Sequence, residues 1–189
     1  MAEFEALKLR LLNGSHQAVA YQGQLAGYTH VHEALSDPKI FSFLKNYMIQ
    51  DVVPTLNIPS GFDVKQYIDT LLDRFSNSHV GDLLARLSQD SSSRIPKFVL
   101  PTVLDSLSQG TSHKFGTQVL ASWLRYLTLG TNTNRFTLDD PQLTELANAV
   151  SAASSDPVEF LRQVPQLTAL LSYPEFLEEF RNAYGDLSS

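Results

Sequence analysis

Apolar residues recur along most of this chain at intervals of three and four, the spacing that places them on one side of an α-helix. The clearest example follows Asp63, which stands at an N-cap position. The apolar residues of this segment share one helix face: Tyr67, Ile68, Leu71, Leu72 and Phe75. Alternation with a period of two, which indicates a strand, is nearly absent. The pattern predicts an all-α fold, a multi-helical single domain over residues 1–189.

Proline, glycine and capping residues divide the pattern into segments. The predicted helices cover residues 1–25 (as one or two helices), 38 to just before Pro54, 64–77, 80–89, 96–109, 115–129 and 141–152, with short helices to the end. Gly27 is expected to end the first segment, and residues 57–62 and 131–135 are expected to be loops. The segment 115–129 is the most apolar, so its Trp123 is predicted to pack in the core.

Composition excludes several classes of function. The 189 residues are 43% hydrophobic and 18% charged, which is enough to bury an ordinary core, and the net charge is −6. An acidic chain without a block of Lys or Arg argues against nucleic acid or an anionic membrane as partner. The chain has no cysteine, which excludes disulfides and thiolate-bound zinc. No stretch has the length of a membrane span and no signal pattern is present, so a cytoplasmic location is expected.

The first segment carries the run Lys8-Leu-Arg-Leu-Leu-Asn13-Gly14-Ser15-His16. On an ideal α-helix, Asn13 lies about 140° and His16 about 80° around from Lys8, so the three side chains can face one cavity while Arg10 points away. In the alternative interpretation, Asn13 and Gly14 stop one helix, Ser15 caps the next, and the three polar residues are ordinary surface residues.

The pattern Lys-x4-Asn-x2-His, followed by an Ala-rich helix with a tyrosine, resembles the active-site helix of the long-chain, metal-independent polyol dehydrogenases, the family of mannitol 2-dehydrogenase and fructuronate reductase. Further segments resemble this family at similar spacings: Asp51-Val-Val-Pro54-Thr-Leu, Arg74-Phe75-Ser76-Asn77, Ser92-Ser93-Arg94-Ile-Pro96-Lys97-Phe98, and Glu175-Phe176 through Tyr184-Gly185. The resemblance covers nearly the whole chain. It implies a helical domain like the C-terminal domain of 6-phosphogluconate dehydrogenase.

The resemblance also implies catalytic roles. Lys8 would be the general base that takes the hydroxyl proton while hydride leaves the adjacent carbon. Asn13 and His16 would donate hydrogen bonds to the oxygen as it becomes an alkoxide. Glu5, three residues before Lys8, would relay the proton towards solvent. Alternatively, Glu5 and Lys8 form an ordinary i,i+3 surface pair.

Two arginines are expected to bind substrate. Arg86 corresponds to an arginine that contacts substrate hydroxyls in mannitol-type members, although it could instead pair with Asp82 four residues earlier on a surface helix. Arg94 stands where the family commonly has a basic residue, usually lysine. Asp90-Ser91 departs from the usual Asp-Gly of the family, which puts the local backbone and the placement of Arg94 in question.

The chain lacks a dinucleotide-binding motif. None of its nine glycines has the G-x-G-x-x-G spacing, and there is no P-loop. Family enzymes carry a Rossmann-type nucleotide domain first and a helical domain second. The chain therefore resembles the second domain, with the N-terminal nucleotide domain absent. That domain would be its partner and would bind most of the NAD or NADP cofactor.

The predicted function is the catalytic and substrate-binding domain of an NAD(P)-dependent, zinc-independent polyol 2-dehydrogenase that interconverts a sugar alcohol and a 2-ketose. The isolated chain is expected to be inactive without a nucleotide domain. The alternatives are a non-catalytic helical interaction module that keeps the family fold, and a fructuronate (hexuronate) reductase domain.

The histidines outside the run are not expected to serve in chemistry. His30 and His32 form a His-x-His pair, but no third ligand is evident near them in the sequence, so no metal site is predicted. His79 and His113 stand near predicted loops and are expected to be solvated.

Overall fold

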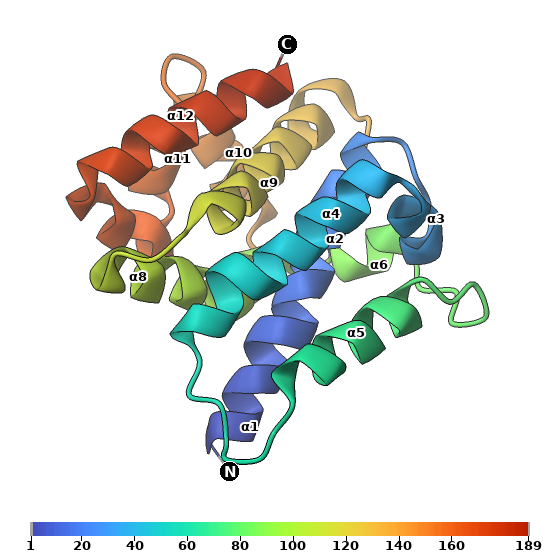
Figure 1. Cartoon of the computed structure of the whole chain (residues 1–189). Helices are drawn as coiled ribbons and strands as arrows, with labels where there is room; N and C mark the ends of the chain where they lie inside the picture. The colour runs from blue at the N-terminus through green and yellow to red at the C-terminus, as the bar shows by residue number, and fades with distance from the viewer. Residues whose placement is uncertain (1, 189) are drawn as a thin grey trace.

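The computed structural model describes residues 2–188, and within them it contains helices and no β-strand. The one β-type pairing in this part of the chain is an isolated bridge between His30 and Leu83. The predicted all-α fold is confirmed (Figure 1). The elements, in chain order, are α1 (Ala2–Leu7), η1 (Lys8–Asn13), α2 (Gly14–Leu25), α3 (Val31–Ser36), α4 (Pro38–Asn46), η2 (Tyr47–Val52), η3 (Val53–Thr55), α5 (Val64–Phe75), α6 (Leu84–Leu87), α7 (Ser91–Phe98), α8 (Leu100–Gln109), α9 (Lys114–Thr133), α10 (Leu143–Ala152), α11 (Val158–Gln163), η4 (Pro165–Ser172) and α12 (Pro174–Ser188).

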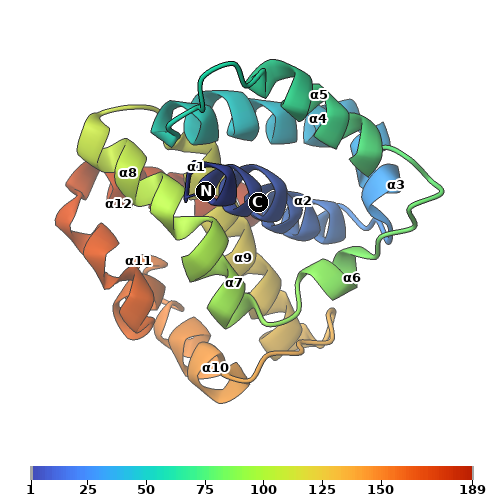
Figure 2. The same ribbon diagram turned by 90° about the horizontal axis from the view of Figure 1, so that it is seen from below.

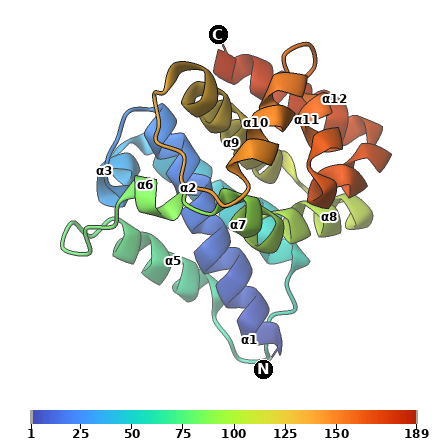
Figure 3. The same ribbon diagram turned by 180° about the vertical axis from the view of Figure 1, so that it is seen from behind.

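The first segment is one continuous helix from Ala2 to Leu25, in which the π-helical turn η1 joins α1 to α2. It runs through the middle of the molecule, with α6 and α7 beside it (Figure 3). As predicted, the helix ends before Gly27, which has a φ of +93°, a conformation that residues with a Cβ rarely adopt. The alternative with a helix stop at Gly14 is wrong, because Gly14 has helical backbone angles, φ −61° and ψ −40°.

The core is built around α9. Trp123 is fully buried, as predicted. Its ring packs on Phe160 in an edge-to-face arrangement, with 5.1 Å between the ring centroids. Helix α12 lies along α9 and buries Phe176 and Phe180 completely (Figure 1). Seen from the N-terminal end of the molecule, α4 and α5 form one side and α10 to α12 the other (Figure 2).

Asp51 is a buried carboxylate at the N-terminus of α9. It accepts hydrogen bonds from the backbone N–H of Gly116 at 2.7 Å and from the Ser112 hydroxyl at 2.6 Å. Burial raises the pKa of Asp51, and the hydrogen bonds from Ser112 and Gly116 oppose that rise. The segment that begins at Asp51 therefore contributes a helix cap from a distant part of the chain.

Several predicted boundaries are wrong. Only Leu84–Leu87 of the predicted helix 80–89 is helical, because Gly81 has a φ of +66° and interrupts the pattern. The predicted helix 96–109 is two helices that meet at Val99, and the first of them already begins at Ser91. The predicted loop 131–135 starts later, because α9 continues to Thr133.

The short helix α3 was not predicted at all. It begins after His30, whose backbone N–H donates to the Glu33 carboxylate at 2.9 Å. The next helix, α4, starts at Pro38 as predicted, with Asp37 as its N-cap and the Lys39 N–H as donor at 2.8 Å.

Candidate functional site

The Lys8 to His16 run lies where the long first helix changes its hydrogen bonding. The backbone N–H of Gly14 donates to the carbonyl of Leu9, five residues earlier, as in a π-helix. Such a bond places residue i+5 about one turn after residue i. The predicted separation of about 140° between Lys8 and Asn13 is therefore wrong, and the π-turn brings Asn13 closer to the side of the helix that carries Lys8.

Arg10, inside the same turn, binds neighbouring helices. Its guanidinium donates to Asp105 of α8 at 2.6 Å and to the hydroxyl of Thr55 at 3.0 Å. As predicted, it points away from the other polar residues of the run, because these contacts hold it against α8 and η3.

Asn13 and His16 line one cavity of about 240 Å³. The other lining residues come from α2, α6 and α7: Gln17, Leu87, Arg94 and Phe98. Lys8 does not line this cavity, and its side chain is exposed. The structure therefore brings Asn13, His16 and Arg94 together and leaves Lys8 outside, one turn before Asn13 on the same helix.

His16 is held in an environment that disfavours its charged form. Its pKa is lowered to about 4, mainly by burial and to a smaller extent by the cations Arg74 and Arg94, while the carboxylate of Asp82 opposes the shift. The ring packs against Phe75, with 4.8 Å between ring centroids. His16 is therefore neutral at pH 7, with one ring nitrogen as donor and the other as acceptor.

The two arginines expected to bind substrate separate in the structure. Arg94 reaches the cavity, and its guanidinium donates to the carbonyl oxygens of Leu87 at 3.1 Å and Arg86 at 3.4 Å. The side chain of Arg86 is exposed and does not line the cavity. The alternative pairing with Asp82 is not formed among residues 2–188, because α6 begins only at Leu84 and the two residues share no helix face.

The Asp90-Ser91 step keeps α7 in place without a glycine. Asp90 adopts the left-handed conformation, with φ 53° and ψ 42°, and Ser91 is already the first residue of α7. Asp140 then holds the start of this helix, accepting from the hydroxyls of Ser91 at 2.8 Å and Ser92 at 2.6 Å and from the Ser92 N–H at 2.8 Å. Burial alone would raise the pKa of Asp140, but these hydrogen bonds together lower it. Serine therefore fits where the family usually has glycine.

Glu5 lies on α1 with an exposed side chain. Within the described part of the chain it forms no ion pair with Lys8, so the alternative of an i,i+3 surface pair is not formed.

Gln17 is a site residue that the sequence did not reveal. It is buried, and its amide donates to the carbonyl of Leu87 at 2.9 Å and accepts from the hydroxyl of Tyr21 at 2.9 Å. The only signal was its position next to His16. Buried polar side chains are usually hydrogen-bonded, and here the bond to Leu87 ties α2 to α6.

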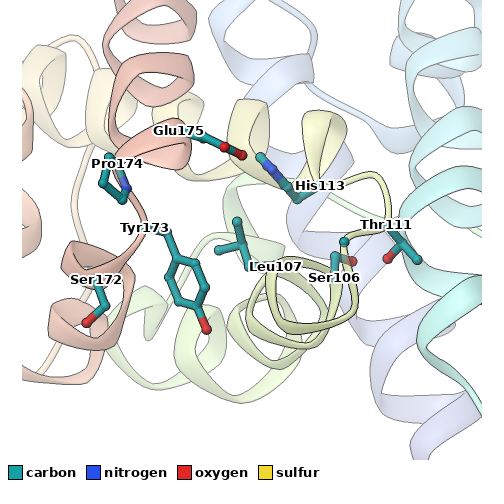
Figure 4. Close-up of a pocket in the computed structure, with 9 residues that line it drawn as sticks. Ser106, Leu107, Thr111, His113, Ser172, Tyr173, Pro174 and Glu175 are labelled. Carbon is teal, nitrogen blue, oxygen red and sulfur yellow. The ribbon is translucent and has the colours of Figure 1, made fainter.

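A second hollow, of about 360 Å³, lies between α8, the loop before α9 and the start of α12 (Figure 4). It is lined by Ser106, Leu107, Gly110, Thr111, His113, Ser172, Tyr173, Pro174 and Glu175. His113 is largely buried here and its ring nitrogen lies 2.8 Å from the Glu179 carboxylate, so the expectation that it is solvated is wrong. His79 is exposed, as expected. Neither Arg86, Arg94 nor any residue of the run from Lys8 to His16 lines this hollow.

No three His, Cys, Asp or Glu side chains between residues 2 and 188 are grouped so that they could hold a metal ion. The rings of His30 and His32 lie 5.4 Å apart, and Nδ1 of His30 is 3.2 Å from the Glu33 carboxylate. In the same part of the chain, no helix is both long and apolar enough to cross a membrane.

Comparison with known proteins extends these observations. The model of the mannitol dehydrogenase C-terminal domain matches residues 1–188. Mannitol 2-dehydrogenase of Aspergillus niger is 36% identical over 192 residues, covering 98% of this chain and 38% of the relative. That of Pyrenophora tritici-repentis is 39% identical over 188 residues, covering 98% of this chain and 32% of the relative. The chain thus spans about a third of the length of these relatives.

Two solved structures share the fold. Pseudomonas fluorescens mannitol 2-dehydrogenase, in a ternary complex with NAD and D-mannitol, superposes with a TM-score of 0.89 at 36% identity, covering 99% of this chain and 38% of that one. Substrate-free D-sorbitol dehydrogenase superposes with a TM-score of 0.71 at 27% identity, covering 95% of this chain and 40% of that one. With a domain match along residues 1–188 and relatives at this identity, the chain belongs to the mannitol dehydrogenase C-terminal domain family.

Proposed function

We propose that this chain is the substrate-binding and catalytic domain of an NAD(P)-dependent polyol 2-dehydrogenase, which oxidises a sugar alcohol to a 2-ketose. The observation that supports this most strongly is the cavity shared by Asn13, His16 and Arg94. Its volume of about 240 Å³ suits a molecule smaller than a typical drug, for which pockets begin at about 300 Å³. All its polar lining residues can donate hydrogen bonds, as the hydroxyls of a polyol require.

Asn13 and His16 would stabilise the substrate oxygen as its proton leaves. The amide of Asn13 and the neutral imidazole of His16 each offer an N–H donor from a fixed helix. Donors that are already positioned need no reorganisation in the transition state, and losing one typically costs about 100- to 1000-fold in rate. The low proton affinity of His16 keeps it a neutral donor, so the proton must go to another group.

Lys8 would be that group. A free lysine is protonated at neutral pH, so a lysine base works only where burial or nearby cations favour its neutral form. Lys8 is exposed in this chain and is paired with no carboxylate among residues 2–188. We propose that the nucleotide domain covers Lys8 and that Glu5, on the same face, passes the proton to solvent.

The dinucleotide would be held elsewhere. Binding of its pyrophosphate needs a glycine-rich turn from a strand into a helix, and residues 2–188 contain no strand. NAD or NADP, bound by the nucleotide domain, would accept the hydride from the carbinol carbon. The residues of this chain would therefore bind and orient the polyol and remove its hydroxyl proton, and no metal takes part in this proposal.

One observation favours a second candidate, a helical interaction module without catalysis. Lys8 stands outside the cavity in this chain, and a site with an exposed base is incomplete. The two candidates differ in what Lys8 does once a nucleotide domain is attached.

The test replaces Lys8 in this chain joined to a nucleotide-binding domain of the family. Lys8→Ala should lower kcat for mannitol by about 100- to 10,000-fold, the range for a general base, while the affinity for NAD is retained. Small added amines should restore part of the rate. Lys65→Ala, an exposed lysine on α5, is the matched control and should leave the rate unchanged. Equal activity of Lys8→Ala and the control would contradict the proposal, and a joined protein without any polyol oxidation would favour the interaction module.

The substrate class is tested at the two arginines. Arg94→Ala should raise KM for mannitol and lower kcat together, because a guanidinium can hold two hydroxyls in a fixed geometry. Loss of a hydrogen bond to a charged group costs about 1.5–3 kcal/mol. Arg86→Ala should have a smaller effect of the same kind, since Arg86 lies outside the cavity. If the parent enzyme prefers a reduced uronate over mannitol and arabinitol, the chain is a hexuronate reductase domain instead.

A further inference from the structure

Gly14 is packed more tightly than a side chain would allow. A Cβ added there would lie 2.9 Å from the carbonyl oxygen of Phe98 and 3.0 Å from the hydroxyl of Tyr47. The φ of Gly14 is −61°, so its conformation does not require glycine and only the space does. Tyr47 is fully buried, and its hydroxyl has no hydrogen-bond partner in the described part of the chain.

The neighbour at Gly14 is of a different kind from those at the other crowded glycines. A Cβ at Gly23, Gly116 or Gly130 would meet the side-chain carbons of Leu84, Val103 or Leu138. Side chains such as these can adopt another rotamer, whereas a carbonyl oxygen moves only with its helix. A methyl group at Gly14 would therefore have to displace α7 or the π-turn itself.

This contact joins the two walls of the cavity. Gly14 directly follows η1 and lies between Asn13 and His16, which form one wall. Phe98 belongs to α7, which also carries Arg94 and forms the facing wall. The distance between the catalytic helix and the arginine helix is thus set where the backbone at Gly14 meets the backbone at Phe98.

We propose that Gly14 is a positioning residue that sets the separation between Asn13 and His16 on one side and Arg94 on the other. The proposal rests on the proposed function and deepens it, because it names what fixes the substrate-binding geometry. Tyr47, buried on η2, is the second close neighbour: its hydroxyl lies 3.0 Å from the position of a Cβ at Gly14, on the side where the Phe98 carbonyl also lies.

The kinetic arm of the test uses Gly14→Ala in this chain joined to a nucleotide-binding domain. Misplacement of reacting groups by about 1 Å can cost about 100-fold, so the smaller shift needed here should lower kcat about tenfold and raise KM for mannitol, with NAD affinity unchanged. Gly130→Ala is the matched control, because its Cβ meets only Leu138 and it lies outside the cavity. It should leave both constants unchanged at a similar loss of stability.

The rescue arm separates positioning from general damage. Tyr47→Phe removes one of the two atoms that a Cβ at Gly14 would meet. The double variant Gly14→Ala/Tyr47→Phe should regain several-fold in kcat over Gly14→Ala. If Gly14→Ala alone does not fold, the double variant takes its place in every measurement. A kcat like that of the unaltered enzyme in a folded Gly14→Ala protein would overturn the proposal.

The spectroscopic arm does not depend on enzymatic activity. In the 189-residue chain, an NMR titration of the His16 ring should show the pKa of about 4 moving towards the ordinary value in Gly14→Ala but not in Gly130→Ala, because separated walls admit water. An unmoved His16 titration would overturn the positioning role even if Lys8 proves catalytic. A moved titration in the chain, together with no polyol oxidation by the joined protein, would uphold the positioning role and refute the proposed function.

Discussion

The two ends of the run from Lys8 to His16 differ in how far the rest of this chain encloses them. At one end, His16 is largely buried, packs on Phe75 and has its pKa lowered to about 4. At the other end, two turns earlier on the same helix, Lys8 is exposed and lies outside the cavity. A single helix thus carries His16 in an enclosed environment and Lys8 in a solvent-exposed one. Under the proposed function, this chain would build the substrate-binding half of the site, and the nucleotide domain would enclose the base.

The surroundings of His16 have a structural support that those of Lys8 lack. Asp140 anchors α7, and α7 brings Arg94 to the cavity beside His16. No element of residues 2–188 covers the exposed side chains of Glu5 and Lys8 in a comparable way.

The largest effect on stability expected from a polar residue of the run is a pH dependence caused by His16. Its pKa in the folded chain, about 4, lies below the ordinary value of 6.5, so folding disfavours the protonated form. Above pH 6.5 both states are neutral and the group contributes nothing. As the pH falls from 6.5 to 4, the unfolded chain takes up a proton that the folded chain does not, and the free energy of unfolding should fall by about 2 to 3 kcal/mol.

Urea denaturation at several pH values measures this effect. His16→Gln should lose that part of the pH dependence, whereas His79→Gln, at an exposed histidine, should keep it. Identical pH profiles for the two variants would mean that His16 is as exposed to solvent as Lys8.

Much of this architecture follows from the sequence pattern. The helices around Ile68 and Trp123 were predictable because buried residues at helical spacing leave a periodic signal. The prediction of a helix over 80–89 failed, because a single glycine with positive φ, Gly81, interrupts a stretch whose apolar spacing still fits a helix.

The site was only partly predictable, for a physical reason. The spacing of the run from Lys8 to His16 predicted that Asn13 and His16 face one cavity. The π-turn could not be predicted, because an i→i+5 bond depends on the packing around the helix, which the local sequence does not show. The different placements of Arg86 and Arg94 likewise depend on where α6 and α7 begin, and boundaries leave a weak signal in the sequence.

A second prediction tests whether Asp140 anchors α7 beside His16. Asp140→Ala removes the acceptor for Ser91 and Ser92 at the start of α7 and should lower the free energy of unfolding by about 1 to 2 kcal/mol. KM for mannitol in the joined enzyme should rise with it, since Arg94 lies on this helix. Asp139→Ala, whose carboxylate accepts only from Gln89 at the surface, is the control. A larger loss in the control would show that Asp140 does not hold α7.

The smallest expected effect on stability is that of replacing the exposed Lys8. Lys8→Ala in this chain should change the free energy of unfolding by no more than about 0.5 kcal/mol, because the side chain is exposed and forms no ion pair within residues 2–188. Leu11→Ala, at a fully buried position of the same π-turn, should cost about 2 to 5 kcal/mol. Thermal or urea unfolding of both variants measures the difference. A large destabilisation by Lys8→Ala would show that this end is already packed and needs no partner to complete it.

The division of the site between two domains is tested most directly by calorimetry and turnover measured on the same samples. The chain alone and the chain joined to a nucleotide-binding domain of the family are each titrated with NAD and then assayed with mannitol. The account predicts that the chain alone neither binds NAD detectably nor oxidises mannitol, and that the joined protein does both. Oxidation of mannitol by the chain alone would contradict it.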